Sequence, residues 1–260
     1  MRIDSPANPR IKSALRAVEN GERLLLESER AIGEALAAGV VPDEIFLEGE
    51  EGGEVAGVIE EAARRGAAVH PVSSKVLRKL SDLPSARGVV ALAVPPCRSL
   101  SDLPLSKDLP SSSLFVLLAG VQDPANVGAI VRSAEAFGAE GVLLTPDCAS
   151  PYSPKAVRAS AFSALRVPLV PGVVPEEAAG WAAQFGATLA GAETRGGQSP
   201  SALAGVRPLV LVIGSEGRGI APALESRLSL RVTIPLGGRV ESLNAAVAAG
   251  ILLGRASGRT

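Results

Sequence analysis

The chain has 260 residues, of which 47% are apolar and 20% charged, so it can bury a large core in one or two globular domains. Its net charge of −1 gives no overall positive field that would favour nucleic acid, and leaves that role to local basic clusters. The apolar runs are shorter than a membrane span, and residues 1–20 lack a signal-peptide core. We therefore expect a cytoplasmic protein with no membrane-spanning segment. Two cysteines and one histidine argue against a disulfide framework, an ordinary zinc site and a histidine-based hydrolase, and we expect no metal.

The first part of the chain predicts a small α/β domain over residues 1–94. Asn8 is a candidate cap for an opening helix with Pro9 at its first position. His70 lies in a strand-like segment, where we interpret it as a residue supported by packing rather than a catalytic base. The expected strands are 24–27, 44–48, 67–72 and 88–94, and the later helices are 28–39, 54–65 and 73–80.

A stretch rich in Pro and Ser, residues 95–113, predicts a linker to a second domain over residues 114–260. That domain alternates short apolar runs with helical segments, which is the pattern of a mostly parallel sheet covered on both faces. Its expected strands are 114–120, 141–146, 167–170, 187–192, 209–215 and 231–236, and its helices begin near Asn126, Ser153, Pro175, Pro222 and Ser242. Ligands of such sheets bind beyond the carboxyl ends of the strands, so functional residues should gather in those loops.

Two of these loops carry unusual polar or glycine patterns. In residues 120–138, Asn126 precedes a helical segment with Arg132, whose guanidinium we expect to reach toward the helix N-terminus, a place suited to phosphate. A capped helix with a solvent-facing arginine is the alternative. Residues 209–220 run from a buried strand into a glycine-rich turn, where Gly214 lets backbone approach a ligand and Glu216 supplies a carboxylate. Phosphate-loop and dinucleotide motifs are absent, and a plain tight turn is the alternative.

The third loop opens an alanine-rich helix within residues 232–254. Ser242 can cap this helix by accepting a backbone N–H, which would explain a serine there. Asn244 is neutral at best for helix propensity, so it points to a contact outside the helix.

In order along the chain, N-x-G-x-x-x-R, I-G-S-E-G-x-G and I-P followed by S-L-N resemble the signature motifs of the SpoU (TrmH-like) RNA 2′-O-ribose methyltransferases of the SPOUT superfamily. The match spans residues 114–258. Residues 1–94 resemble the L30e-like RNA-binding domain of that family, through "SPANPRIKSAL" and "LSDLPSARGVVALAV". The resemblance implies an α/β fold, with a mostly parallel sheet and a deep trefoil knot in the C-terminal domain and a smaller N-terminal α/β domain.

The resemblance also implies S-adenosylmethionine as methyl donor, a ribose 2′-hydroxyl as acceptor, and ribosomal RNA as favoured substrate with transfer RNA as an alternative. Matching positions give Gly214, Ile234 and Leu243 as cofactor contacts. The implied catalytic set is Asn126, Arg132, Glu216, Ser242 and Asn244. Since arginine stays protonated at ordinary pH, we interpret Arg132 as a phosphate clamp that stabilises developing alkoxide charge rather than as the base.

The resemblance also implies a homodimer that packs through the helix of the first motif and the last helix. The small residues of the last helix suit such close packing. A non-catalytic RNA-binding or ribosome-assembly factor on the same fold, and an α/β nucleotide enzyme of other chemistry, stay open as alternatives. The basic residues expected to contact RNA phosphates are Arg10, Lys12, Lys75, Arg78 and Lys79. The resemblance adds Arg158 and Ser160 as RNA contacts, because residues 152–170 are similar to a serine- and arginine-containing loop of the family.

Overall fold

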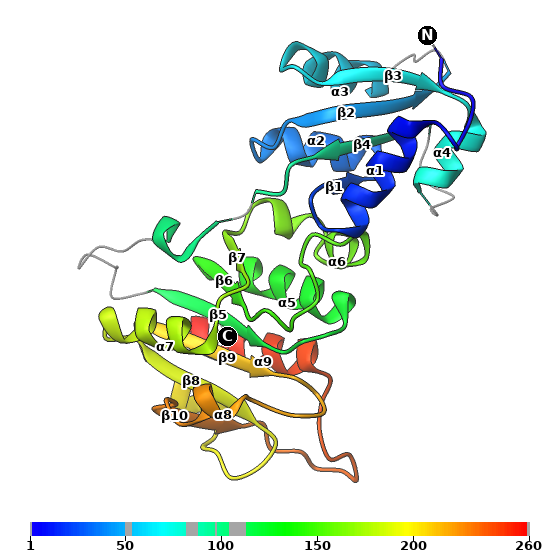
Figure 1. Ribbon diagram of the computed structural model, residues 1–260. Coiled ribbons are helices and arrows are strands. Elements are labelled where there is room, and N and C mark those ends of the chain that lie inside the picture. The colour runs from blue at the N-terminus through cyan, green and yellow to red at the C-terminus, as the bar shows by residue number, and fades with distance from the viewer. Residues whose placement is uncertain (1, 50–53, 82–87, 97, 104–112, 259–260) are drawn as a thin grey trace. The chain divides into compact units, whose positions relative to one another are not determined.

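The structure is a computed structural model that describes residues 2–49, 54–81, 88–96, 98–103 and 113–258. Its contacts divide the chain into two compact units (Figure 1). The N-terminal unit comprises Met1–Pro96 with Tyr152–Pro154, and the C-terminal unit comprises Cys97–Pro151 with Lys155–Thr260. Within the described residues, no helix is long and apolar enough to cross a membrane.

The N-terminal unit is built on a mixed four-stranded sheet in the order β1-β4-β2-β3. Strand β4 pairs antiparallel with both β1 and β2, whereas β2 and β3 are parallel. Helix α1 begins as predicted, because the Asn8 side chain accepts from the Arg10 N–H and Pro9 takes the first position. The elements are α1 (Pro9–Glu19), β1 (Leu24–Leu26), α2 (Glu29–Ala37), β2 (Pro42–Glu48), α3 (Glu54–Arg64), β3 (Ala68–Val72), α4 (Ser74–Leu80) and β4 (Val89–Ala93).

The C-terminal unit is built on a six-stranded sheet in the order β10-β8-β9-β5-β6-β7. All of its strand pairs are parallel, so the expected α/β class with a parallel sheet is confirmed. The strands are β5 (Leu114–Ala119), β6 (Gly141–Leu144), β7 (Leu169–Pro171), β8 (Thr188–Glu193), β9 (Leu209–Gly214) and β10 (Leu230–Thr233). The helices are α5 (Pro124–Ala136), α6 (Pro154–Ala159), α7 (Pro175–Gln184), α8 (Pro222–Glu225) and α9 (Ala245–Ser257), with 3-10 turns η1 (Leu100–Asp102), η2 (Ser163–Leu165) and η3 (Pro200–Leu203).

Helices cover both faces of this sheet, as Figure 1 shows for α7 and α9. Alternate residues of a strand face opposite sides, and β5 is buried along its whole length. On one face Phe115 and Leu117 pack with Trp181 of α7 and Leu224 of α8, while α5 and α9 pack against each other and against strands on the other face. The strands are therefore fixed in the core, and their carboxyl ends carry the three loops that hold the motifs.

Two helix starts differ from the prediction. Helix α5 begins at Pro124 with Asp123 as its cap, two residues before the expected start at Asn126. Helix α9 begins at Ala245, and its cap is Asn244 rather than Ser242. The physical reason is that the Asn244 carbonyl oxygen accepts from the N–H groups of both Ala246 and Val247, and so takes the capping role expected of Ser242.

The segment predicted as a linker is described only in part. Turn η1 lies within it, and Leu103, which follows the turn, is buried in the core of the C-terminal unit. Residues 104–112 of the predicted linker lie outside the described residues. The trefoil knot implied by the resemblance stays a prediction.

Candidate active site

A directed chain of hydrogen bonds joins the three motif loops. The Glu216 carboxylate, which follows β9, accepts from the Asn126 amide nitrogen in the first turns of α5. The Asn126 carbonyl oxygen accepts in turn from Nδ2 of Asn244 at 2.9 Å. The Asn244 carbonyl oxygen is then left to accept from the backbone of α9, at 2.9 Å from the Ala246 nitrogen and 3.3 Å from the Val247 nitrogen. We call this chain the amide relay.

The two ends of the amide relay fix its direction. An ionised carboxylate only accepts hydrogen bonds, so Asn126 must turn its NH₂ group toward Glu216. The N–H groups at a helix start only donate, so Asn244 must turn its oxygen toward α9. Each amide is therefore held in one orientation by a group that cannot reverse its role, and Asn126, Glu216 and Asn244, predicted from three separate motifs, meet in space.

A pocket of about 400 Å³ opens beside the relay at the carboxyl ends of β8, β9 and β10. Its walls come from residues 192–195, which span the end of β8, from residues 213–220, which span the end of β9, from the end of β10 and the loop that follows it, and from one side of α9. Glu216, at one end of the relay, belongs to the wall, so the pocket and the relay form one site. Gly214, Ile234, Ser242 and Leu243 line it as well.

The pocket wall carries charged groups of both signs. The lining residues with carboxylates are Glu193, Glu216, Glu225 and Glu241. Those with guanidinium groups are Arg195 and Arg218, and both are exposed. Arg231 lies 2.8 Å from Glu193 and 3.9 Å from Glu225. Within the described residues, Glu216 and Glu241 have no cationic partner, and their carboxylates favour a ligand that carries positive charge.

Position 214 requires glycine because the backbone of Gly219 and Ile220 lies very close to it. Ser215 and Gly219 exchange two backbone hydrogen bonds, of 3.1 and 2.9 Å, which close the glycine-rich turn. A Cβ at Gly214 would lie 2.5 Å from the carbonyl carbon of Gly219 and 2.7 Å from the nitrogen of Ile220. Because any side chain would push the turn away, glycine here keeps backbone groups of the turn at the wall of the pocket.

The start of α5 is bonded to α6. One carboxylate oxygen of Asp123 accepts from the Ala125 N–H at 3.0 Å and from Nζ of Lys155 at 2.8 Å. The Lys155 ammonium, together with the Ala125 N–H, lowers the pKa of the Asp123 carboxyl below its usual value. The carboxylate that caps α5 is therefore ionised at neutral pH.

Arg132 lies on α5 but outside the relay. Its side chain is exposed, and within the described part of the chain it makes no hydrogen bond or ion pair. Six residues separate it from Asn126, which turns it to a different side of the helix. Of the five predicted catalytic residues, the structure joins three by hydrogen bonds, places Ser242 in the pocket wall, and leaves Arg132 on the surface of α5.

The comparison with known families decides what the chain is. The sequence model of the SpoU rRNA methylase family matches residues 113–254, which are more than half of the chain. The chain belongs to the SpoU rRNA methylase family.

Relatives match along both units. A protein of Mycolicibacterium vanbaalenii named as a tRNA/rRNA methyltransferase is 31% identical over 262 residues, covering 97% of this chain and 83% of that protein. The structure of an AdoMet-bound rRNA methyltransferase from Sinorhizobium meliloti is 26% identical with a TM-score of 0.86, covering 98% and 97% of the two chains. A solved RNA 2′-O ribose methyltransferase is 30% identical with a TM-score of 0.77, covering 98% of each chain.

In this SpoU family member, the basic residues predicted for the N-terminal unit lie mainly on two neighbouring helices. Helices α1 and α4 contact each other and share one core, to which α1 contributes Ile11 and α4 contributes Leu77. The outward sides of the two helices carry Lys12, Lys75, Arg78 and Lys79, all exposed. We call these four residues the basic face.

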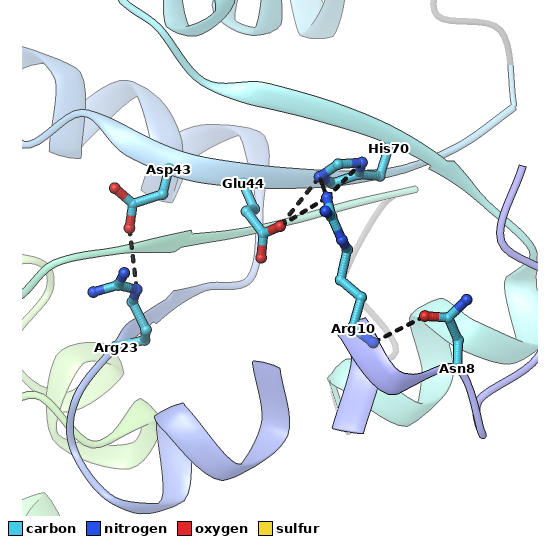
Figure 2. A network of polar contacts seen from close by, with 6 residues as sticks. All are labelled: Asn8, Arg10, Arg23, Asp43, Glu44 and His70. Atoms are coloured by element: carbon cyan, nitrogen blue, oxygen red, sulfur yellow. Dashed lines mark hydrogen bonds and ion pairs between the residues drawn. The ribbon is translucent and has the colours of Figure 1, made fainter. Parts of the chain in front are cut away.

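Arg10 differs from the basic face because it is engaged in a polar cluster, which Figure 2 shows. Its Nη1 lies 3.0 Å from Oε1 of Glu44 and 2.5 Å from Nε2 of His70. The His70 ring also packs against Phe46, with ring centroids 5.5 Å apart. These contacts agree with the interpretation of His70 as a residue supported by its neighbours.

Ser160 is the predicted RNA contact that the structure contradicts. Its side chain is fully buried, its hydroxyl donates to the Val157 carbonyl at 2.8 Å, and its oxygen accepts from the Ala164 N–H at 3.3 Å. Both bonds close the turn after α6, so the serine serves the fold. Arg158, predicted beside it, is exposed on α6.

Sequence reasoning missed the residues of the site that no motif marks. Thr194 and Arg195 after β8 and Glu225 of α8 line the pocket, and Lys155 reaches the α5 cap. Only the rule that ligands bind at the carboxyl ends of parallel strands points to the loop after β8. Within the described residues, no group of three or more His, Cys, Asp or Glu could hold a metal ion.

Proposed function

We propose that the chain transfers a methyl group from S-adenosylmethionine to a ribose 2′-hydroxyl of RNA, with ribosomal RNA as favoured substrate and transfer RNA as the alternative. The observation that carries this proposal is the amide relay, which brings residues of all three motifs together beside one pocket. Membership of the SpoU family and relatives named as RNA methyltransferases support it. The cytoplasmic location stays a prediction.

The pocket suits the methyl donor in size, shape and charge. Its volume of about 400 Å³ lies in the range of sites for ligands of this size. Gly214, Ile234 and Leu243 would hold the cofactor, since all three line the pocket and the close approach at Gly214 keeps the backbone of the turn in its wall. Glu216 and Glu241, which have no cationic partner within the described residues, would favour a cationic sulfonium and ammonium. When bound, S-adenosylmethionine supplies an electrophilic methyl group.

The residues around the pocket must orient the ribose and handle its proton. A 2′-hydroxyl is a poor nucleophile at neutral pH, so positioning and charge stabilisation contribute most. Within the described chain only one Glu216 oxygen is occupied, by Asn126, so the other can accept from a ribose hydroxyl. The relay holds that carboxylate in place, and Ser242 in the wall offers a further hydroxyl to the nucleotide.

Arg132 would act on charge rather than as a base. Its guanidinium stays protonated, and it has no internal partner in the described chain, so it is available to an RNA phosphate. There it would clamp the phosphate beside the target ribose and stabilise the alkoxide that develops, while the proton leaves through that phosphate or a water molecule.

The basic face and Arg10 would supply RNA affinity outside the site. Exposed lysines and arginines bind phosphates with a strong dependence on salt. Because the residues of the basic face come from two helices fixed on one core, they would bind the RNA as one surface.

Substitution of Arg132 by Lys tests the mechanism. We expect calorimetry to show unchanged S-adenosylmethionine binding while methyl transfer to RNA falls at least a hundredfold, because an ammonium lacks the bidentate fork of a guanidinium. Retained turnover would overturn the role of Arg132. Failure of the unaltered protein to bind S-adenosylmethionine would favour the non-catalytic RNA-binding factor.

Mapping of 2′-O-methyl positions tests the substrate. Total RNA from cells with and without the protein should differ at one or a few ribose positions in ribosomal RNA. A difference confined to transfer RNA would establish the alternative substrate, and a methyl group on a base would refute ribose methylation.

We also propose a homodimer through α5 and α9. These two helices contact each other, and the outer side of α9 exposes Val247 at 52% and Ile251 at 40%, one turn apart. Sedimentation at micromolar concentration should give twice the mass of the chain, and Ile251→Lys should shift the protein toward monomer. A monomeric unaltered protein would contradict the proposal.

A further inference from the structure

Lys155 stands next to the active site without any role in the motifs. Its Nζ lies 2.8 Å from the Asp123 carboxylate that caps α5, and Asn126 of the amide relay follows three residues after that cap. The Lys155 side chain is 58% exposed and Asp123 45%. An ammonium group has three N–H donors, and the bond to Asp123 uses one. The other donors face solvent at the start of the helix that carries both Asn126 and Arg132.

A close packing contact holds Lys155 in this place. Helix α6 crosses α5 at Gly128, where an added Cβ would lie 2.2 Å from the Ala156 carbonyl oxygen and 2.8 Å from the Ala159 Cβ. Glycine therefore lets the two helices approach backbone to backbone. Because Ala156 is the neighbour of Lys155, this contact fixes the base of the lysine side chain relative to Asn126.

The charges around the relay call for a cation there. Asp123 caps the helix that carries Asn126, and Glu216 is bonded to Asn126, so two carboxylates lie near this residue. Carboxylates repel phosphate. Lys155 offsets the charge of Asp123 and keeps two further N–H donors for a phosphate.

We infer that Lys155 binds a backbone phosphate of the RNA next to the target ribose, through the N–H donors that its ion pair with Asp123 leaves unused. The inference rests on the proposed function and adds to it a residue that orients the RNA strand across α6. Lys155 is an RNA-binding residue here, and Asp123 is the helix cap whose charge competes with phosphate for the Lys155 ammonium.

The test compares Lys155→Gln and Asp123→Asn. Filter binding to 23S ribosomal RNA and to bulk transfer RNA, both made in vitro, is measured between 50 and 200 mM KCl. The salt slope is the steepness with which the logarithm of the binding constant falls with the logarithm of the salt concentration, and loss of one phosphate contact lowers it by about 0.7 to 0.9. Over this fourfold range of salt, the variant should therefore lose about threefold less affinity than the unaltered protein loses. We expect this change for Lys155→Gln, and retention of most of the slope for Lys155→Arg.

Asp123→Asn separates RNA contact from a structural ion pair. Asparagine still caps a helix, so α5 keeps its start while the ion pair is lost. If Lys155 binds phosphate, removal of the Asp123 charge leaves RNA affinity equal or raises it, whereas Lys155→Gln lowers it. If the pair is only structural, the two variants weaken RNA binding alike through a common loss of thermal stability, and that result would overturn the inference.

Two controls keep the inference apart from the proposed function. Arg64→Gln removes an exposed cation of α3 that pairs with Glu61, and it should leave the salt slope unchanged. S-adenosylmethionine binding by calorimetry should be unaltered in all variants. An unaltered protein that methylates RNA, together with a Lys155→Gln variant of normal salt slope, would refute the role of Lys155 alone. An unaltered protein that transfers no methyl group to any RNA would refute the proposed function.

Discussion

Substitution of Gly214 by Ala should damage the pocket more than any other single methyl group added to the glycine-rich turn. The new Cβ would meet backbone atoms of Gly219 at 2.5 and 2.6 Å. Backbone cannot rotate away as a flexible side chain can, so the turn after β9 must shift. Gly217, three residues later in the same turn, has nothing within 4 Å of an added Cβ and no left-handed backbone. Gly217→Ala is therefore a matched control.

The cost of Gly214→Ala follows from the contacts that must change. Forced overpacking costs about 1–3 kcal/mol, and the two hydrogen bonds between Ser215 and Gly219 add about 1 kcal/mol each if the turn opens fully. For a unit of this size we expect the melting temperature to fall by about 3–10 °C. If the cofactor needs the turn in its present shape, its affinity should fall about 10- to 100-fold, since 1.4 kcal/mol corresponds to a factor of ten.

Calorimetric titration with S-adenosylmethionine and thermal denaturation measure these effects. Gly217→Ala should bind the cofactor within about twofold of the unaltered protein, because a small change at an uncrowded surface position costs under about 0.5 kcal/mol. The reasoning fails if Gly214→Ala binds as tightly as Gly217→Ala. It also fails if both variants lose binding together, because the close approach to Gly219 would then not be the cause.

The remaining predictions concern α9 and α5. Asn244→Ser keeps an oxygen for the α9 cap but loses the amide N–H that donates to Asn126. Its stability should therefore stay within about 0.5 kcal/mol of the unaltered protein, while methyl transfer falls about tenfold or more. Asn244→Ala loses the cap as well, so it should also lose about 1 kcal/mol of stability. Equal activity of Asn244→Ser and the unaltered protein would contradict the role of the relay. Glu135 of α5 accepts from Arg166 at 2.6 and 2.9 Å, a hydrogen bond that lowers the pKa of its carboxyl. The Glu135 carboxylate therefore contributes its full share of the free energy of unfolding above the unfolded-state pKa near 4.3. That contribution is lost as the pH falls through the lower pKa of the folded state. In the unaltered protein, the ion pair between Glu135 and Arg166 should make the free energy of unfolding fall by under about 1 kcal/mol between pH 5 and 3, because both side chains are partly exposed. Urea denaturation should show that Glu135→Gln loses this pH dependence.

Local patterns were sufficient to predict the elements. Runs such as 114–119 and 209–214 are apolar at every position, and a parallel strand buried on both faces demands this pattern. Asn8 with Pro9 predicted the start of α1, because a capping side chain and a proline at the first helical position act within a few residues. The meeting of Asn126, Glu216 and Asn244 was predictable because each follows or neighbours the carboxyl end of a strand, where parallel strands bring their loops together.

Choices between tertiary partners were not predictable. Both Ser242 and Asn244 can cap a helix, and the selection of Asn244 depends on Asn126, which is more than a hundred residues away in the chain. Ser160 has the residue type of an RNA contact, but its burial depends on how α6 packs on α5 at Gly128. Lys155 gave no signal because its partner Asp123 lies on another helix. The strand order β10-β8-β9-β5-β6-β7 likewise depends on pairing over long sequence separations.

The one-way direction of the amide relay makes distant parts of the chain mutually dependent. A donor at position 216, such as lysine, would force the Asn126 amide to rotate, and Asn244 would then have to rotate as well. That rotation would take from α9 the oxygen that accepts its first N–H groups. Replacement of Glu216 by a donor would therefore destabilise the start of α9. A compensating substitution at Asn244, rather than one near the glycine-rich turn, would be needed to restore that helix start.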